Sequence, residues 1–407
     1  MSRSHYDVVI VGARCAGAAT GLLLARQGAR VLIVDHDQPG TDTMSTHALM
    51  RAGVMQLHRW GVLDAVRTSG APPVRAASFI YGSESLTVDI RPAFGTDALY
   101  APRRWALDSI LARAASNAGA ELRYGVSCRG VLRASDGRVA GVRLKTASGR
   151  LETVTAGVVV GADGRRSTLA RLVDAPILAT SRHASAVVYG YFDGLQNQGY
   201  RWYWDAGAAG GMIPTHGGQS CVFLSLPDSR ASDLRHRSGA DLVAAARALV
   251  PELAKDLGGA SAPESLISFG GQVGRLRQAS GPGWALVGDA GYFKDPISAH
   301  GISDALRDAE ILAESIVAGR PDDYPRLRDA LSMDLFHITD RMAAFDWTMD
   351  ELKALHAKLN AAMKLEQDWI AAQPAPPTAV PPFAFPADAG PEWMSRVGRS
   401  GVQTAAQ

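Results

Sequence analysis

The chain has 407 residues, of which 47% are hydrophobic and 20% charged, values that are ordinary for a globular protein with a large core. This length predicts one large interleaved unit or two to three domains. The 42 Lys and Arg residues nearly balance the 40 Asp and Glu residues and form no long basic run, so nucleic acid is not expected as a partner.

Cysteine, histidine and hydropathy patterns narrow the class further. The cysteines Cys15, Cys128 and Cys221 are odd in number and far apart, which favours reduced thiols and a cytoplasmic location. The ten histidines show no metal-ligand spacing, so no metal site is expected. No apolar run approaches the roughly 18 residues of a membrane span, so stable membrane insertion is not expected either.

The first elements in the chain form a predicted βαβ unit. Residues 7–11 are short and β-branched like a buried parallel strand, residues 16–27 favour a helix, and residues 30–35 form the next strand. Gly12 and Asp35 are 35 − 12 = 23 residues apart, near the roughly 20 expected for an acid that binds the ribose of a dinucleotide.

The turn of this unit departs from the usual glycine fingerprint. Gly12, Ala13 and Gly17 are small residues, but Arg14 stands where the second glycine is usual. An outward-pointing side chain need not block the approach of a pyrophosphate, so we predict cofactor binding by these four residues and by Asp35. Arg14 itself either contacts phosphate or is a solvated surface arginine.

Two later strands also end in polar turns. Residues 158–160 run into Gly161-Ala162-Asp163-Gly164-Arg165-Arg166-Ser167, and residues 284–287 run into Gly288-Asp289-Ala290, followed by Asp295-Pro296-Ile297-Ser298-Ala299-His300-Gly301 and a helical pattern through Val317. Open α/β sheets bind ligands where such strand ends meet. We therefore expect all three turns to lie at one sheet edge.

These three motifs, in this order, resemble the FAD-dependent aromatic hydroxylases of the para-hydroxybenzoate hydroxylase type, over roughly residues 5–325. Flavin halogenases and geranylgeranyl-reductase-like flavoproteins share much of the same frame. The resemblance implies FAD as the cofactor and NAD(P)H as its reductant. The cofactor-binding positions that it adds to those of the first turn are Arg51, Arg104, Asp163, Gly164, Gly288, Asp289, Pro296 and Gly301.

Within this resemblance, Asp289 contacts the FAD ribityl chain, Pro296–Gly301 lines the isoalloxazine ring and Arg104 lies near the pyrophosphate. A helix that begins near Ser298 would direct its free N–H groups to the flavin and favour the reduced form. One departure concerns the nicotinamide cofactor, because the arginine usual three residues after Ser167 is replaced by Ala170.

Two histidines are catalytic candidates. His300 occupies a position where hydroxylases commonly have a small residue, so it either faces the flavin or substrate or turns away to support the helix start. By resemblance, His47 lies in a segment beside the flavin. It is either a base that removes a phenolic proton or a loop residue without a chemical role.

The expected fold is α/β, with a Rossmann-like, mostly parallel FAD-binding domain interleaved with an antiparallel-sheet substrate domain and followed by a C-terminal helical segment. Short apolar and aromatic runs between glycine turns predict the antiparallel strands. The domains are 1–75, 101–180 and 281–325 for FAD; 76–100 and 181–280 for substrate; 326–372 helical; and 373–407 a Pro/Ala-rich tail.

The substrate is expected to be a hydrophobic and aromatic small molecule. Alternate positions of a strand face the same side, and aromatic walls suit planar ligands. The pocket candidates are Tyr189, Tyr191, Trp202, Trp204 and His216.

The resemblance implies a monooxygenase that acts through a C4a-hydroperoxyflavin and inserts one atom of O2. The alternative is a flavin reductase or dehydrogenase of the geranylgeranyl-reductase-like type acting on a C=C bond. Flavin halogenases resemble one another in a lysine that captures hypohalous acid and in a W-x-W-x-I-P segment. Here no lysine precedes Lys145, and Trp202-x-Trp204 lies well before Ile213-Pro214, so a halogenase is disfavoured. Either a monomer or a homodimer is compatible with the sequence.

Overall fold

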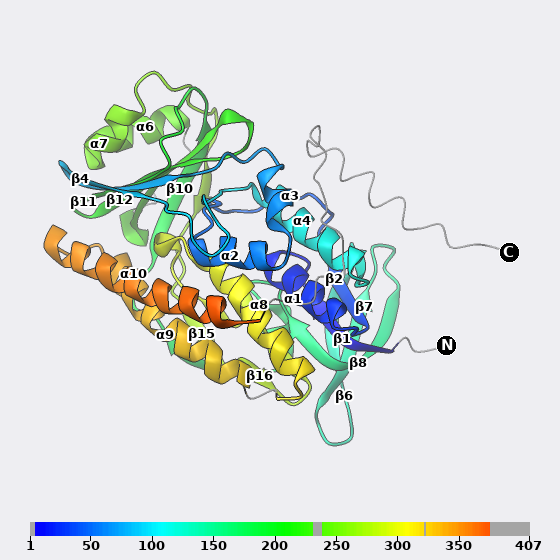
Figure 1. Cartoon of the computed structure of the whole chain (residues 1–407). Coiled ribbons are helices and arrows are strands. Elements are labelled where there is room, and N and C mark those ends of the chain that lie inside the picture. Colours follow the sequence, from blue (N-terminus) through cyan, green and yellow to red (C-terminus); the bar gives the residue numbers. More distant parts are fainter. Residues whose placement is uncertain (1–4, 231–237, 321–322, 375–407) are drawn as a thin grey trace.

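The computed structural model describes residues 5–230, 238–320 and 323–374, and two large sheets organise it (Figure 1). The first sheet has the order β16-β17-β8-β1-β2-β5, with β7 paired to β8 and β6 paired to β7. Strands β17, β8, β1, β2 and β5 run parallel. The bounds are β1 (His5–Val11), β2 (Val31–Asp35), β5 (Glu121–Tyr124), β6 (Ser127–Arg133), β7 (Val139–Lys145), β8 (Leu151–Gly161), β16 (Ser280–Gly281) and β17 (Trp284–Leu286).

The register of this sheet brings the three predicted turns to one edge. Val11 at the end of β1 is paired with Val34 of β2 and with Gly161 of β8, and Gly161 is also paired with Leu286 of β17. Because parallel strands end together, the turns after β1, β8 and β17 lie side by side.

Three helices, α1 (Cys15–Arg26), α4 (Arg104–Asn117) and α8 (Gly301–Val317), pack together beside this sheet (Figure 1). Helix α1 is almost entirely buried because its small residues let it lie close to the strands. At Gly21, for example, an added Cβ would lie 2.4 Å from Cδ1 of Ile33. The first helix is therefore held in place by close packing and cannot shift along the sheet.

The second sheet is largely antiparallel, with the order β14-β10-β13-β12-β11-β3-β4 and one parallel pair, β11 with β3. Alternation along its strands gives it two apolar faces. One face packs against α6 (Gly239–Leu249) and α7 (Pro251–Asp256), and the other belongs to the main core of the molecule. The bounds are β3 (Ala76–Tyr81), β4 (Glu84–Asp89), β10 (Ser185–Phe192), β11 (Tyr200–Asp205), β12 (Ala208–Pro214), β13 (Ser220–Pro227) and β14 (Ile267–Phe269).

Smaller elements join the two sheets. Strands β9 (Ile177–Thr180), β15 (Arg275–Arg277) and β18 (Tyr292–Phe293) form a third sheet. Long helices α9 (Asp323–Ala343) and α10 (Met349–Ala372) pack against each other, and α10 also contacts α2 (Arg51–Arg59). The remaining helices are α3 (Leu63–Arg67), α5 (Thr168–Leu172) and the short 3-10 helices η1 (His216–Gly218), η3 (Gly288–Ala290) and η4 (Pro296–Ser298).

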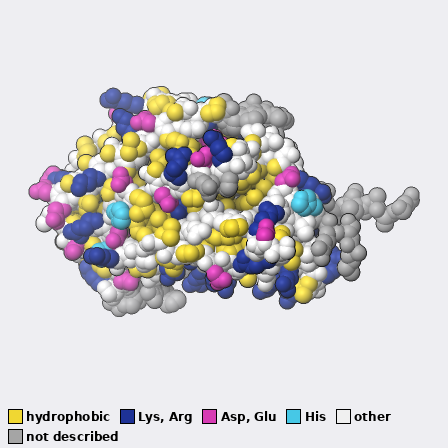
Figure 2. Space-filling view, turned by 90° about the horizontal axis from the view of Figure 1, so that it is seen from below, with side chains coloured by type: hydrophobic (Ala, Val, Ile, Leu, Met, Phe, Trp, Pro, Cys, Tyr) yellow, Lys and Arg dark blue, Asp and Glu magenta, His cyan; other side chains and the backbone are white. Residues whose placement is uncertain are grey.

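The predicted fold class is confirmed: a mostly parallel α/β sheet, an antiparallel sheet and C-terminal helices are all present. The predicted tail at 373–407 lies outside the described residues apart from Gln373 and Pro374. None of the described helices is long and apolar enough to cross a bilayer. On the face shown in Figure 2, basic, acidic and hydrophobic side chains are interspersed.

Candidate active site

The turn after β1 is closed by backbone contacts that only glycine permits. Gly12 has φ +111°, and an added Cβ would lie 2.4 Å from the carbonyl oxygen of Ala162. At Gly17 an added Cβ would lie 1.8 Å from the carbonyl oxygen of Gly12. The Ala13 N–H donates to the Asp35 carboxylate at 2.7 Å, so the end of β2 is fixed to the turn.

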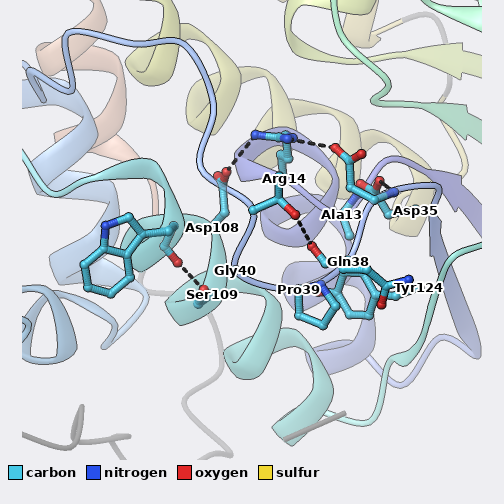
Figure 3. A pocket seen from close by; sticks show the side chains of 12 residues that line it. Ala13, Arg14, Asp35, Gln38, Pro39, Gly40, Asp108, Ser109 and Tyr124 are labelled. Carbon is cyan, nitrogen blue, oxygen red and sulfur yellow. Dashed lines mark hydrogen bonds and ion pairs between the residues drawn. The ribbon is translucent and has the colours of Figure 1, made fainter. Parts of the chain in front are cut away.

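A cavity opens beside this turn (Figure 3). Asp35, the acid predicted to bind a ribose, lies at its wall. The cavity is lined by Ala13, Arg14, Asp35, Asp37, Gln38, Pro39, Gly40, Thr41, Trp105, Asp108, Ser109 and Tyr124.

Arg14 lines this cavity, and its side chain is partly exposed. Its guanidinium donates to Asp37 at 2.8 Å and lies 3.7 Å from Asp108, while its buried Nη1 has no hydrogen-bond partner among the described residues. Arg104 pairs with the same Asp108 at 3.0 Å. Asp108, which lines the cavity, thus lies between two guanidinium groups, and Arg14, which lines it too, has a donor without a partner among the described residues. Guanidinium groups of this kind suit a pyrophosphate.

The turn after β8 uses its acid to cap a helix. The carboxylate of Asp163 accepts hydrogen bonds from Ser167 Oγ at 2.5 Å and from the Thr168 N–H at 2.6 Å, at the start of α5. Gly164 has φ +74° and open space where a Cβ would be. Asp163 thus holds the turn in shape through α5, and Gly164 is the position at which the backbone is open to a ligand.

The turn after β17 brings an acid to the same edge. Gly288 has φ +59°, and an added Cβ would lie 2.9 Å from Cβ of Ala16 in α1. Burial raises the pKa of the neighbouring Asp289 carboxyl, against the opposing charges of Arg104 and Lys294. Asp289 therefore lies within electrostatic reach of the cations at the edge, where the resemblance places a ribityl contact.

The helix predicted to begin near Ser298 begins instead at Gly301, which corrects that boundary. Pro296–Ser298 form the 3-10 helix η4, and Ala299 adopts the left-handed conformation with φ +49°, which separates the two helices. At Gly301 nothing lies within 4 Å of an added Cβ. The first turn of α8 is therefore open at its amino end.

His300 turns part of its ring toward the C-terminal helices. Its Nε2 lies 2.6 Å from Oε2 of Glu366 in α10, and both side chains are fully buried. Its Nδ1 is buried without a hydrogen-bond partner among the described residues. One ring nitrogen of His300 is thus hydrogen-bonded to Glu366, and the other has no partner among the described residues.

The residues at this edge fit FAD. At the amino end of α8, Ser298 Oγ, Ser303 Oγ and His300 Nδ1 are buried polar atoms that have no hydrogen-bond partner in the described part of the chain. The first backbone N–H groups of a helix also lack partners within the helix. Such groups are costly unless a ligand satisfies them. Together with the open Gly301, the paired guanidinium groups and Asp35, they match an elongated anionic dinucleotide.

His47 and the predicted tyrosines meet in one buried cluster. His47 has φ +68° and is 1% exposed, and its Nε2 lies 2.6 Å from the Tyr191 hydroxyl. The Ser45 N–H donates to the Tyr189 hydroxyl at 3.1 Å. Burial, with help from Arg103 and Arg104, holds the pKa of His47 well below its usual range.

Arg103 and Asp42 belong to the same cluster, and the sequence analysis did not assign them a role. The guanidinium of Arg103 lies 3.6 Å above the ring centroid of Tyr191 and is paired with Asp42 at 2.5 Å. The Arg103 N–H donates to Nδ1 of His216 at 3.1 Å. The sequence marks Arg103 only by its position next to Arg104.

The predicted tryptophans lie on the same sheet face, farther along it. Pairing aligns Tyr189 with Phe223, Phe223 with Gly211 and Gly211 with Trp202, so these side chains form one row across the sheet. Trp204 lies instead against the C-terminal helices, with its ring centroid 4.7 Å from that of His356. Four of the five pocket candidates, Tyr189, Tyr191, Trp202 and Trp204, therefore lie on one face of the sheet, with Trp204 against His356 of α10, whereas His216 lies in η1 after β12.

Arg51 does not reach the dinucleotide turn in this structure. Its guanidinium donates to Thr96 Oγ1 at 3.2 Å and to the Arg91 carbonyl at 2.9 Å, which ties the start of α2 to the loop after β4.

Fold and site together define a flavoprotein oxidoreductase, with a dinucleotide-binding α/β sheet covered by an aromatic antiparallel sheet. A family model described as "FAD binding domain" matches residues 5–319. The chain belongs to this family, that of the FAD-dependent aromatic hydroxylases of the para-hydroxybenzoate hydroxylase type, and its cofactor is FAD.

Named relatives divide between two reactions. The chain is 28% identical over 349 residues to a menaquinone reductase of Mycolicibacterium smegmatis, with 78% of each chain covered. It is 26% identical over 382 residues to a 6-methylpretetramide 4-monooxygenase of Streptomyces rimosus, covering 89% of this chain and 87% of the relative. Among solved structures, the flavin-dependent brominase Bmp2 has a TM-score of 0.75 at 18% identity, covering 98% of this chain and 99% of that one, a likeness of fold alone.

Proposed function

We propose that this protein is an NAD(P)H-reduced, FAD-dependent monooxygenase that adds one oxygen atom from O2 to a hydrophobic, aromatic small molecule bearing an acidic hydroxyl group. The observation that carries the proposal is the His47–Tyr191 pair, a buried base with a free ring nitrogen on an aromatic sheet face. The wider family supports a hydroxylase, and the relative from Streptomyces rimosus, a 6-methylpretetramide 4-monooxygenase by name, supports a monooxygenase.

Arg14, Arg104, Asp35, Asp289 and the amino end of α8 are the groups proposed to hold FAD. When bound, FAD accepts two electrons from reduced nicotinamide and uses them to activate O2. The chain's own task is to orient the substrate, to exclude water and to move a proton. The aromatic row on β10, β13 and β11 provides the apolar wall for the first two tasks.

The proton is handled by His47 through Nδ1. The Tyr191 hydroxyl, whose raised pKa keeps it protonated, donates to the Tyr189 oxygen. With its own proton used there, Tyr191 accepts the Nε2–H of neutral His47, and this assignment of the ring proton leaves Nδ1 of His47 as an acceptor. His47 is unprotonated at neutral pH because its pKa is lowered, so Nδ1 can accept the proton of a substrate hydroxyl as the ring becomes electron-rich.

The test uses purified holoenzyme with 18O2 and a panel of phenols and polycyclic phenols. Wild type is expected to add one 18O atom to a phenolic substrate. His47→Gln should lower the rate of oxygen insertion by about 10²- to 10⁴-fold, while NAD(P)H still reduces the bound FAD. Tyr203→Phe is the matched control, because Tyr203 lies on the opposite face of the same sheet, bonded to Asp256, and should leave the rate unchanged.

A second candidate function is a flavin reductase acting on a C=C bond. It is favoured by the mycobacterial menaquinone reductase, which matches over most of both chains. The two functions separate under anaerobic conditions with a quinone or isoprenoid substrate. Consumption of NAD(P)H without O2, with a product two hydrogens heavier and no added oxygen, would replace the monooxygenase proposal.

A further inference from the structure

A carboxylate from the last described helix reaches the flavin motif. Glu366 lies near the end of α10, 66 residues after His300, yet its Oε2 is 2.6 Å from Nε2 of that histidine. Both side chains have no exposed area. Helix α10 runs alongside the α8 and α9 region (Figure 1), so the C-terminal helices contribute directly to the loop that precedes α8.

The pair lies in a buried network of charges drawn from three elements. Helix α8 provides Asp304, Arg307 and Asp308, the loop after β18 provides Lys294, and α10 provides Glu366. The ion pairs are Arg307 with Asp308 at 2.7 Å, with Asp304 at 3.1 Å and with Glu366 at 3.4 Å, together with Lys294 and Asp304 in contact. Arg307 also donates to Ser332 Oγ of α9 at 2.8 Å.

The charges of this network do not cancel while His300 is neutral. With Lys294 protonated, three carboxylates face two cations, so the formal sum is 2 − 3 = −1, and it becomes zero when His300 binds a proton. Burial, with the neighbouring charge of Arg307, lowers the pKa of Lys294 to about 7, so the contribution of His300 is read below that pH. Burial opposes that proton and lowers the pKa of His300, whereas Glu366 favours it. The pKa of Glu366 is lowered to about 2, because the charge and the hydrogen bond of His300, together with Arg307 and Lys294, outweigh its burial. The carboxylate of Glu366 therefore stays ionised.

The geometry fixes which nitrogen takes the proton. An ionised Glu366 accepts the Nε2–H of His300, which leaves Nδ1 as the basic atom of the neutral ring. That Nδ1 is buried and has no partner among the described residues, next to the open first turn of α8 and the unpartnered Ser298 Oγ. His300 thus has one vacant proton site at the end of the helix that faces FAD.

We propose that Glu366 positions His300 as a proton store for the flavin, so that His300 Nδ1 takes a proton from solvent when bound FAD is reduced and returns it when FAD is reoxidised. A hydride from reduced nicotinamide brings two electrons and one proton to FAD, which adds one negative charge at the amino end of α8. The proton on His300 balances that charge, and no other reactant is needed. The inference rests on the proposed position of FAD but not on oxygen chemistry, because both candidate functions reduce FAD.

A metal ion is a poorer occupant for these groups. His300, Asp304 and Glu366 could each offer an atom to one ion. However, Lys294 and Arg307 already bind the two carboxylates, and a divalent cation would compete with both. The proton-store role uses the network as it stands.

The experiment measures the reduction potential of FAD in the holoenzyme as a function of pH under anaerobic conditions. Over the pH range in which His300 titrates, the wild-type potential should fall more steeply with pH than the potential of Glu366→Gln. Glu366→Gln holds the formal charge of the network at 2 − 2 = 0, the wild-type value at the acidic end, so the two potentials should agree there. At the upper end of the range the potential of Glu366→Gln should exceed that of wild type by about 30 mV, which corresponds to about tenfold in the two-electron equilibrium. His300→Gln holds the network at −1, so it should show the same shallow slope but lie about 30 mV below wild type at the acidic end, and the double variant should match Glu366→Gln.

Asp308→Asn is the matched control, since it removes a buried carboxylate of the same network that is bound to Arg307 but not to His300. It should lower the melting temperature and keep the wild-type pH slope. In parallel, the histidine NMR signal that disappears in His300→Gln should report a higher pKa in the reduced than in the oxidised holoenzyme, which tests the idea even if the variants fold poorly.

An unchanged slope and potential in Glu366→Gln, or a His300 pKa that does not respond to reduction, would overturn the proton store. Neither result would bear on oxygen insertion, which is read separately from product mass. Loss of 18O incorporation with an intact proton-linked potential would instead overturn the monooxygenase proposal alone.

Discussion

Glycines on the two sides of the candidate FAD site have opposite surroundings. At Gly12 and Gly17, in the turn after β1, an added Cβ would lie 2.4 and 1.8 Å from a backbone oxygen. At Gly164, before α5, and at Gly301, the first residue of α8, an added Cβ would meet nothing within 4 Å. One pair of glycines brings backbone against backbone, and the other pair borders free space.

This difference separates residues that build the fold from residues that admit a ligand. A closed turn needs glycine whether or not a cofactor is present, because any side chain would push β1, α1 and β8 apart. An open helix start needs glycine only where something large must approach the backbone. Substitutions at the two places should therefore fail in different ways.

The largest effect is expected for Gly17→Ala. The new methyl group would overlap the Gly12 carbonyl oxygen, so the turn must open, and the free energy of unfolding should fall by about 3 kcal/mol or more. Purified protein should be colourless or insoluble, as read from flavin absorbance per chain and from thermal unfolding.

Gly301→Ala is the matching variant on the open side. It should leave the melting temperature of the apoprotein unchanged and lower the affinity for FAD. If both variants lowered the melting temperature equally, the distinction between glycines that build the fold and glycines that admit a ligand would be wrong.

A smaller effect is expected for Asp35→Ala on the closed side. Asp35 is 6% exposed and accepts hydrogen bonds from the Ala13 N–H at 2.7 Å and from the Asp37 N–H at 2.9 Å. A buried donor left without an acceptor costs about 1–3 kcal/mol, and the ribose contact is lost as well. We expect FAD affinity to fall by about 10- to 100-fold in a fluorescence titration. Asp37→Asn, on a partly exposed side chain, should cost much less, and a reversed order would contradict the role of Asp35.

The closed side could be predicted from sequence because its determinants are local. The strand, small-residue turn, helix and acid lie within residues 5–35, and strand hydropathy and helix formers report directly on them. The start of α8 was misjudged by three residues because Ala299 adopts a left-handed conformation that alanine rarely shows, and no residue type marked it.

The proton-handling groups could not be predicted as pairs because they join distant segments. His47 and Tyr191 are 144 residues apart, and each was a candidate separately, but only the register of β10 brings the two side chains together. Glu366 lies in an ordinary amphipathic helix, and nothing in its neighbourhood marks it as a partner of His300. The local sequence pattern shows the type of each residue and the face of the helix or strand on which it lies. These contacts depend instead on how distant helices and strands pack against one another.

The substrate side should also respond to pH through its histidines. Burial lowers the pKa of His216 and of His356 from 6.5 to about 4 in each case. Below about pH 6.5 the unfolded chain binds protons that the folded chain refuses, so stability should fall as the pH drops from 6.5 to 4. Each histidine accounts for about 2–3 kcal/mol over that range.

Urea unfolding between pH 7 and pH 4 measures this slope. His356→Gln should make it shallower than in wild type. The difference between the two proteins is the readout, because burial raises the pKa of Asp295 to about 6, which has the opposite sign in the acidic range. A slope that stays the same in His356→Gln would mean that the ring packed against Trp204 is free to take a proton when folded.

The smallest effect on FAD binding is expected for a substitution of Arg51. Comparing it with a substitution of Arg104 tests which of the two arginines contacts the cofactor. Its guanidinium is held by Thr96 and by the Arg91 carbonyl, whereas Arg104 lies within electrostatic reach of Asp289 and pairs with Asp108 at the cavity wall. Arg51→Gln should change the dissociation constant of FAD by less than about threefold, the range left when a mutated side chain does not touch the ligand. Arg104→Gln should weaken FAD by tenfold or more, since a charge-assisted contact at the pyrophosphate is lost. If the two variants weaken FAD equally, Arg51 leaves the loop and reaches the cofactor in the holoenzyme, as the family resemblance implies.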